Sequence, residues 1–210
     1  MVDWTTVSSL ATGAGTLVLA IATFAAVRSA NRSARVTERS LQAGIRPVIV
    51  TSRLGDAPEK VGFADNKWFK VEGGRAVAEA TDEAVYLVVA LRNVGTGLAV
   101  LDRWDFYDER PMGDGAIRSI DGFRRLTRDL YIAPGDQGFW QGAFRDPADP
   151  VFQAARAAIE DQRSMTIDLL YGDHEGGQRA VSRFSLIPDG SGGWLAVVVR
   201  HWNLDRDDPR

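Results

Sequence analysis

Residues 4–27 read WTTVSSLATGAGTLVLAIATFAAV, a run of 24 residues without a charged side chain. As an α-helix with a rise of about 1.5 Å per residue, the run is roughly 36 Å long, which is enough to cross a hydrocarbon core of about 30 Å. Trp4 stands at one end, where an indole ring favours the membrane–water interface. The sequence therefore predicts a transmembrane helix within residues 1–27.

The charges on either side of this run predict its orientation. A cleaved signal peptide carries positive charge before its apolar stretch, whereas only Asp3 and the α-amino group precede this one. Arginines follow the run, and such residues mark the cytoplasmic end of a membrane helix. We expect a single-pass plasma-membrane protein with its N-terminus outside and its C-terminal domain in the cytoplasm. The lack of cysteine fits a reducing compartment.

Residues 28–45 are expected to continue the helix as a basic juxtamembrane segment, because no proline occurs before Pro47 and Gly44 is a typical stop signal. The arginines recur every three or four residues, which places them in one stripe along a helix. The stripe consists of Arg28, Arg32, Arg35 and Arg39. It is either a solvated face or a contact with anionic lipid or an acidic partner. The opposite face is too small and polar for a strong coiled coil, so a homo-oligomer is possible but not predicted.

Net charge limits the partners. The chain carries −3 in total, residues 28–46 contribute +4 and Asp3 contributes −1, so residues 47–210 carry −6. A domain this acidic is not expected to bind nucleic acid. Arginine outnumbers lysine 22 to 3, a bias that suggests a high-GC bacterium.

Alternating apolar residues predict a β domain over residues 46–203. Residues 84–93 are apolar on both faces, which is typical of a central strand covered on both sides. One helix is expected to start at Asp149 as the N-cap and Pro150 as the first helical residue, and to end near Gln162. Strands are expected over residues 47–54, 84–93, 98–107, 129–133, 138–144, 165–171, 179–187 and 194–202.

These elements predict a mainly β fold, an antiparallel immunoglobulin-like sandwich with one short helix, preceded by a long N-terminal helix. Residues 55–81 and 109–128 are expected to be long polar excursions, and residues 204–210 a disordered tail. Glycines around His174 indicate an exposed hairpin turn between the strands at 165–171 and 179–187.

Several short motifs carry a resemblance. They are Arg46-Pro47 after a basic helix, the connection Asn93-Val94-Gly95-Thr96-Gly97-Leu98-Ala99, and Tyr171-Gly172-Asp173 in a late hairpin. This pattern resembles uncharacterised bacterial, actinobacteria-like membrane proteins with one N-terminal span and an immunoglobulin-like β-sandwich. The resemblance covers most of residues 1–190 and implies no activity, catalytic residue or cofactor. The asparagine–glycine connection also resembles adhesion-type sandwich modules of bacterial surfaces, which would require the opposite topology.

The connection after the strand at 84–93 is interpreted as a structural turn made by Asn93, Gly95 and Gly97. A dinucleotide-binding loop needs a third glycine at position 100 and a following helix. Position 100 is valine, and the residues after it alternate like a strand. The glycines are therefore expected to allow positive φ angles at a hairpin or bulge.

Four other features are weighed as sites. His174 beside Asp173 and Glu175 has too few neighbouring ligands for a zinc site, since His201 is the only other histidine. Asp102, Asp105, Asp108 and Glu109 form an acidic cluster expected to make surface ion pairs with Arg103 and Arg110. Ser191 lacks the nucleophile-elbow pattern and indicates a turn. Trp194 and Trp202 are expected to share one face of the last strand.

No catalytic, metal-binding or cofactor motif is found, so the sequence favours a binding function. We expect a membrane-tethered scaffolding module that engages an unknown protein partner through loops or a sheet edge. One alternative is an extracytoplasmic adhesin or ligand-binding domain on a signal anchor. A second is a hydrolase whose loops gather His174 or His201 with carboxylates.

Overall fold

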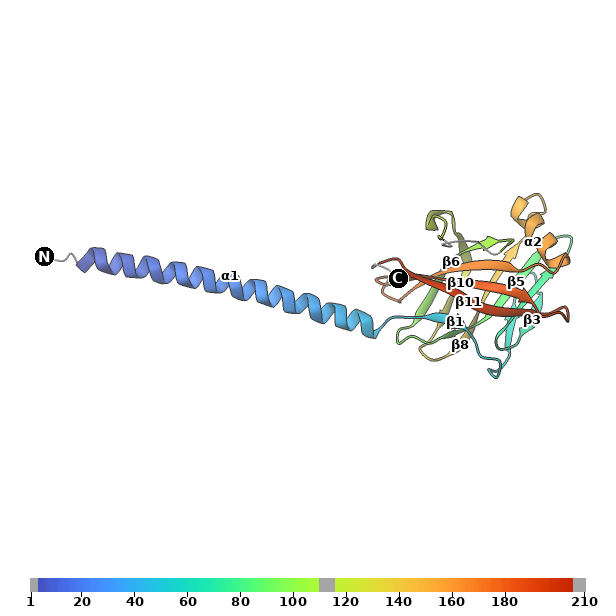
Figure 1. Cartoon of the computed structure of the whole chain (residues 1–210), viewed down its shortest axis with the longest axis horizontal. Coiled ribbons are helices and arrows are strands. Elements are labelled where there is room, and N and C mark those ends of the chain that lie inside the picture. Colours follow the sequence, from blue (N-terminus) through green and yellow to red (C-terminus); the bar gives the residue numbers. More distant parts are fainter. Residues whose placement is uncertain (1–3, 110–115, 206–210) are drawn as a thin grey trace. The chain divides into compact units, whose positions relative to one another are not determined.

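The computed structural model describes residues 4–109 and 116–205 of the chain (Figure 1). The chain divides between Ala43 and Gly44 into two compact units.

The first unit is a single helix, α1 (Trp4–Gly44), which runs without a break through the apolar and basic segments and ends at the predicted glycine. Within it, Gly13–Glu38 is long and apolar enough to cross a membrane and is not buried against other parts of the protein. The Thr23 hydroxyl donates to the Leu19 carbonyl at 2.8 Å, so this polar group is satisfied within the helix. The predicted N-terminal apolar helix and its basic helical continuation are confirmed.

The second unit is mainly β. Its elements are β1 (Ile49–Thr51), β2 (Glu59–Gly62), β3 (Trp68–Val71), β4 (Arg75–Ala80), β5 (Val85–Asn93), β6 (Ala99–Tyr107), the 3₁₀ turn η1 (Ile120–Gly122), β7 (Arg124–Ile132), β8 (Gln137–Phe144), α2 (Pro150–Glu160), β9 (Met165–Gly172), β10 (Arg179–Pro188) and β11 (Trp194–Asn203).

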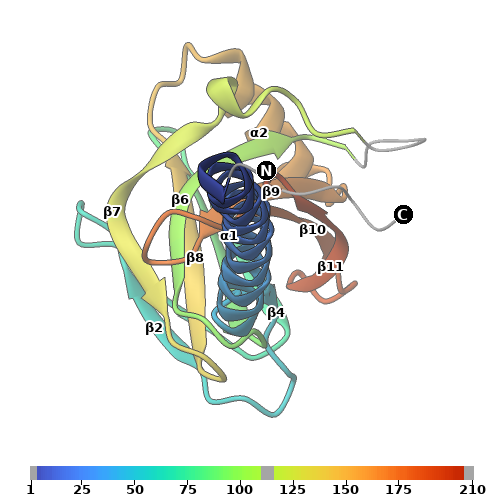
Figure 2. The same ribbon diagram turned by 90° about the vertical axis from the view of Figure 1, so that its left-hand side faces the viewer.

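Nine of these strands form one curled antiparallel sheet (Figure 2). From β7 the order is β7-β6-β9-β10-β11-β4-β5-β8, and β1 pairs with β5 beyond the end of β4. Strands β2 and β3 form a separate hairpin. A mainly β, antiparallel fold with one short helix in the domain is confirmed. A sandwich has two separate sheets, so this continuous sheet does not confirm the immunoglobulin-like sandwich.

The inner face of the curled sheet holds the main core, and α2 packs into it through Phe152 and Ala155. Strand β5 is covered on both faces, as predicted. Leu87 on its inner face belongs to the main core, whereas Val88 on its outer face packs against the β2–β3 hairpin. Helix α2 starts as predicted, because the Asp149 carboxylate accepts the Val151 amide at 2.9 Å.

The prediction that residues 55–81 form an excursion without strands is wrong, since β2, β3 and β4 lie there. Strands β2 and β3 have only four residues each, which is too short for their alternation to stand out in a stretch rich in charged residues. Of residues 109–128, those from Arg124 onward belong to β7, and residues 110–115 lie outside the described residues. In the expected disordered tail, Asp205 accepts the Arg179 amide, and residues 206–210 lie outside the described part of the chain.

The prediction that Trp194 and Trp202 share a face of β11 is also wrong. The register between β10 and β11 shifts between Arg183 and Phe184, where Val199 is left without a partner. One extra residue in a strand reverses which face the following side chains take. Trp194 therefore packs in the main core, whereas Trp202 packs in a separate outer cluster around Val181.

Candidate functional site

The two ends of the curled sheet leave an open seam between β7 and β8. Each has a single strand partner, β6 for β7 and β5 for β8, and no strand among residues 4–109 and 116–205 pairs with their other edges. A cavity of about 480 Å³ lies here, lined by residues 124–127 of β7 and 141–144 of β8. This volume falls within the range of about 300–1,000 Å³ that is typical of ligand sites.

A bulge in β7 accounts for the opening. Leu130 pairs with Leu101 of β6, but the next paired residue on β7 is Arg125, opposite Arg103. Residues 126–129 thus have no partner on β6 and form an irregular, mostly exposed stretch beside the cavity. Bulges bend a strand and often lie next to functional sites. Strand β8, in contrast, pairs with β5 at eight consecutive positions and is regular.

Aromatic rings form the inner wall of the seam. Trp104 lines the cavity and packs edge-on against Trp140, with ring centroids 5.0 Å apart. Gly142 leaves room for these rings, because a Cβ atom there would lie 2.6 Å from Cζ2 of Trp140 and 2.9 Å from Cζ2 of Trp104. The indole N–H of Trp140 is buried without an acceptor in the described part of the protein. The wall is therefore apolar with one unsatisfied donor close behind it.

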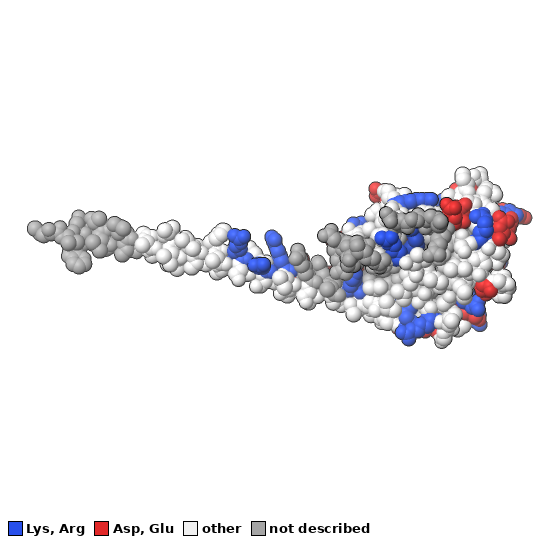
Figure 3. Space-filling model, viewed as in Figure 1, with Lys and Arg blue, Asp and Glu red and all other residues white. Residues whose placement is uncertain are grey.

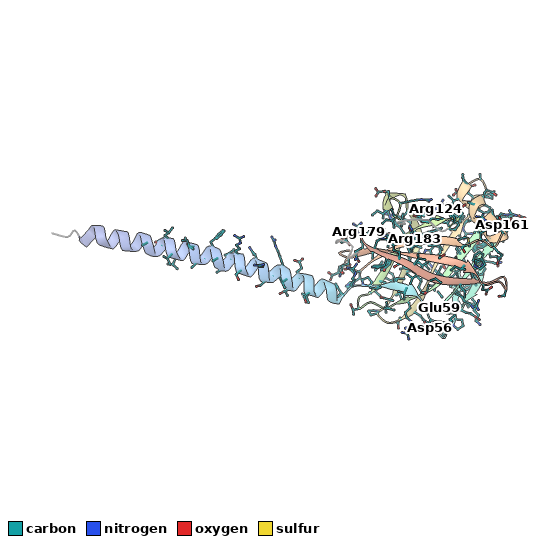
Figure 4. The ribbon with its side chains drawn as sticks, viewed as in Figure 1. Asp56, Glu59, Arg124, Asp161, Arg179 and Arg183 are labelled. Carbon is teal, nitrogen blue, oxygen red and sulfur yellow. The ribbon has the colours of Figure 1, made fainter. Side chains whose placement is uncertain are left out.

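Two ion pairs fix the rim of the cavity. Arg124, labelled in Figure 4, pairs with Asp149 at 2.9 Å. The Val151 amide and then Arg124 hold the pKa of the Asp149 carboxyl below its usual range. On the other side, Arg145 pairs with Asp65, which also accepts the Tyr86 hydroxyl. Those hydrogen bonds, from Tyr86 first and Arg145 second, lower the pKa of Asp65 to about 2. Asp65 thereby ties the β2–β3 hairpin to the seam.

A second cavity of about 500 Å³ adjoins the first, and both are lined by Phe63, Ala64, Thr127 and Gln141. It lies between the β2–β3 hairpin and the bulge of β7. Arg128 on the bulge donates to the Gln141 side chain at 2.7 Å, which links β7 to β8 through side chains only. Trp68, 59% exposed, and Lys60 lie on the hairpin side. The two cavities together are called the seam groove below.

Sequence reasoning missed the seam groove, since most of its residues fall in the stretches taken as polar excursions. The available signal was local. Arg124 and Arg125 precede an alternating run, and Lys60 and Trp68 flank a short turn. Neither pattern shows that the two stretches meet.

The predicted turn residues lie together at the start of β1. The Asn93 side chain is fully buried: its Oδ1 accepts the amides of Val48 and Gly95 at 3.2 and 2.9 Å, and its Nδ2 donates to the carbonyls of Gly97 and Ile132 at 2.7 and 3.0 Å. All four hydrogen-bonding positions of the amide are used. Asn93 therefore fastens the segment leading into β1 to the β5–β6 connection.

The expectation of positive φ angles in this connection is wrong, because neither Gly95 nor Gly97 has one. Both glycines are needed because another backbone lies against them. A Cβ atom at Gly95 would lie 2.3 Å from the Arg46 carbonyl oxygen, and one at Gly97 would lie 1.6 Å from the Ile45 carbonyl oxygen. Close backbone approach is the second common reason for a glycine.

The basic stripe of α1 remains a prediction. Arg28, Arg32 and Arg35 are exposed, and Figure 3 shows basic side chains along the helix in blue. The Arg39 side chain lies outside the described side chains.

Two members of the predicted acidic cluster, Asp102 and Asp105, make ion pairs. Asp105 pairs with Arg118 at 3.4 Å and Asp102 with Arg103 at 3.7 Å, whereas the expected partner Arg110 lies outside the described residues. His174 is exposed and 3.9 Å from Glu175. In the described ranges, no group of three His, Cys, Asp or Glu side chains is placed to hold a metal ion.

Ser191 lies in the predicted turn, where its amide and hydroxyl both donate to Asp189 at 2.8 Å. His201 points inward and lies 3.2 Å from both the Tyr171 and Ser182 hydroxyls. This serine–histidine pair does not resemble a catalytic dyad in its surroundings, since Ser182 is fully buried and donates to the Ile49 carbonyl at 3.0 Å. The contact is structural.

A buried charge pair lies on the outer face of the sheet. Arg183, labelled in Figure 4, binds both carboxylate oxygens of Asp168 at 2.6 Å. The Tyr107 hydroxyl donates to the same carboxylate at 2.9 Å, and burial first and the Asp168 charge second raise the pKa of Tyr107 to about 12. All three groups are buried, and we assign the pair to the packing of the outer face.

Comparison of the chain with protein-family models, with curated proteins and with solved structures gives no match.

Proposed function

We propose that this protein is a membrane-tethered protein-binding module, and that the open edge of β8 accepts an extended segment of its partner. The observation that supports this most directly is the cavity of about 480 Å³ between two strands whose facing edges are unpaired in the described part of the chain. An extended peptide can add to such an edge as a further strand.

Strand β8 is suited to this role because its pairing with β5 is regular over its whole length. In an antiparallel pair, every second residue directs its N–H and C=O groups away from its partner. These groups of β8 face the seam. Because the bulge of β7 leaves residues 126–129 without partners on β6, β7 does not close onto β8 in this region.

Helix α1 supplies the tether in this proposal. The helix segment Gly13–Glu38, long and apolar enough to cross a membrane, supports a span, and the arginines that follow the uncharged run 4–27 support an N-terminus outside and a cytoplasmic β domain. Contact of Arg28, Arg32, Arg35 and Arg39 with anionic lipid belongs to the same proposal. The immunoglobulin-like character suggested by the resemblance is also part of the proposal, supported by the antiparallel strands alone, and so is the bacterial origin, supported by the excess of arginine over lysine.

Peptide binding to the full chain in detergent micelles tests the proposal. The probe is a fluorescent, capped peptide of eight residues alternating threonine and glutamine, matched to the length of β8. We expect an increase in fluorescence anisotropy that Thr127→Trp reduces at least tenfold, because Thr127 is exposed and lines both cavities. The control is Glu83→Trp, an equally exposed site outside the groove. If Thr127→Trp left the affinity for the peptide unchanged, the seam would be rejected as the binding site.

The side of the membrane is tested separately by protease treatment of a C-terminal tag in intact protoplasts. We expect the tag to be protected until lysis. Cleavage in intact cells would instead favour the alternative, an extracytoplasmic adhesin on a signal anchor.

A further inference from the structure

Cationic side chains gather around the seam groove although the domain as a whole is acidic. The lining of the two cavities contains five basic residues, Lys60, Arg124, Arg125, Arg128 and Arg145, and two acidic residues, Asp146 and Asp149. Residues 47–210 carry a net charge of −6. The lining of the groove is thus positively charged, although the domain as a whole is negatively charged.

Three of these cations have no carboxylate partner among the described residues. Arg124 is neutralised by Asp149 and Arg145 by Asp65. The side chains that remain without an ion pair are Lys60, Arg125 and Arg128.

Two of the three cations are held in place by neutral groups. Arg128 donates to Gln141 at 2.7 Å, and its guanidinium lies 5.5 Å from the ring centroid of Phe139. The Lys60 ammonium lies 5.0 Å from the ring centroid of Trp68. That ring rests on Gly62, where a Cβ atom would approach it to 2.8 Å. Contacts with aromatic faces and amides orient these cations without neutralising their charge.

From this charge pattern we infer that the segment accepted by the seam is acidic: an extended polypeptide with carboxylates at alternate positions. The inference rests on the proposed function. Side chains at every second position of a strand lie on one face, so alternate carboxylates can face the unpaired cations while the backbone bonds to β8. The unpaired strand edges favour a polypeptide over other polyanions, because a sugar–phosphate backbone cannot continue a β-sheet.

The experiment compares three fluorescent peptides of one design with the full chain in micelles. Each alternates threonine with glutamate, glutamine or lysine, and a thymidine oligonucleotide of equal length serves as the fourth probe. We expect the glutamate peptide to bind about tenfold tighter than the glutamine peptide and the lysine peptide more weakly than both. High salt should reduce the preference, since the Debye length falls from about 10 Å at 0.1 M to about 3 Å at 1 M.

Single variants locate the effect. Arg125→Gln, Arg128→Gln and Lys60→Gln should each weaken binding of the glutamate peptide about two- to fivefold more than binding of the glutamine peptide. The matched control is Arg53→Gln, which removes one positive charge from an exposed residue outside the groove. It should change neither affinity.

The outcomes separate the two proposals. Equal affinity for the three peptides, lost in Thr127→Trp, overturns the acidic preference and keeps the seam as a peptide site. Absence of binding by every peptide overturns the proposed function and the inference with it. Oligonucleotide binding as tight as that of the glutamate peptide overturns the inference in favour of a general polyanion site.

Discussion

The curled sheet is incomplete at two places, and they are treated in opposite ways. At β1, which is only three residues long, side chains replace the missing strand. The Ile49 amide donates to the Tyr171 hydroxyl and its carbonyl accepts the Ser182 hydroxyl, both at 3.0 Å. At the seam between β7 and β8, no such replacement occurs along the lining of the cavity among the described residues.

Burial explains the difference. Ile49, Tyr171 and Ser182 have no exposed surface, and a buried backbone group without a partner costs free energy comparable to a lost hydrogen bond. At the seam, the edges open into a groove, where water can satisfy their backbone groups. The gap closed by side chains is therefore part of the scaffold, and the gap left open to solvent is the one that we propose as a surface for recognition.

Removing the Asn93 side chain, which anchors the segment before β1, should cause the largest loss of stability. Asn93→Ala leaves the buried carbonyls of Gly97 and Ile132 without their donor, at roughly 1–3 kcal/mol for each unsatisfied group. We expect a loss of about 3–5 kcal/mol in the free energy of unfolding of the full chain, measured by chemical denaturation. Asn93→Asp keeps the acceptor but loses both donors, so it should also be destabilising. If Asn93→Ala left the free energy of unfolding nearly unchanged, water would be replacing the side-chain amide.

Tyr171→Phe should have the next largest effect, about 1–3 kcal/mol, because it leaves the buried Ile49 amide without an acceptor. Thermal unfolding of the full chain measures it. The matched control is Tyr131→Phe, since Tyr131 is 58% exposed and should be indifferent. Equal melting temperatures for the two variants would contradict the view that side chains replace a strand at β1.

The stability that Asp65 contributes at the rim of the cavity should depend on pH. The pKa of Asp65 is lowered from 3.8 to about 2 by the hydrogen bonds of Tyr86 and Arg145. The folded state therefore gains stability above pH 4 that is lost as the pH falls toward 2. Asp65→Asn should lower the denaturation midpoint at neutral pH. Between pH 4 and pH 2 the midpoint of this variant should fall less steeply than that of the unmodified protein. Asp102→Asn, at an exposed site, is the control; an identical decline in both variants would exclude the Asp65 contact as its cause.

The smallest effect on stability is expected within the groove. Arg125→Gln should change the free energy of unfolding by no more than about 0.5 kcal/mol, because Arg125 is exposed and has no ion-pair partner among the described residues. Arg125→Gln should nevertheless weaken binding of the glutamate peptide more than the control variant Arg53→Gln does. A large loss of stability in Arg125→Gln would make the groove part of the scaffold.

Elements with strong local signals were predictable from the sequence. Strand β5 has apolar residues on both faces, α2 has an N-cap followed by proline, and α1 has an uncharged run followed by arginines. Each signal lies within one stretch of about ten to forty residues, so no knowledge of neighbouring strands was needed.

The seam groove could not be predicted, because it depends on bulges and on which strands meet. The bulge at residues 126–129 exists relative to β6, and Val199 is extra only relative to β10. The alternation of apolar and polar residues within one strand reveals neither of these irregularities. Asn93, Gly95 and Gly97 were recognised as a turn, but the reason for the glycines, a backbone segment packed against them, comes from residues 45 and 46.

The route by which α1 joins the domain has a mechanical consequence. Tension along the chain from a membrane anchor would reach first the hydrogen bonds of the Thr96 and Gly97 amides to the Arg46 carbonyl, and then the Asn93 side chain and the Tyr171 hydroxyl, which hold Val48 and Ile49. Strand β5 bonds β1 on one edge and β8 on the other. Strand β5 is therefore one direct connection between the segment that follows α1 and the proposed docking edge. Pulling on the two ends of the chain by force spectroscopy should give a lower rupture force in Asn93→Ala.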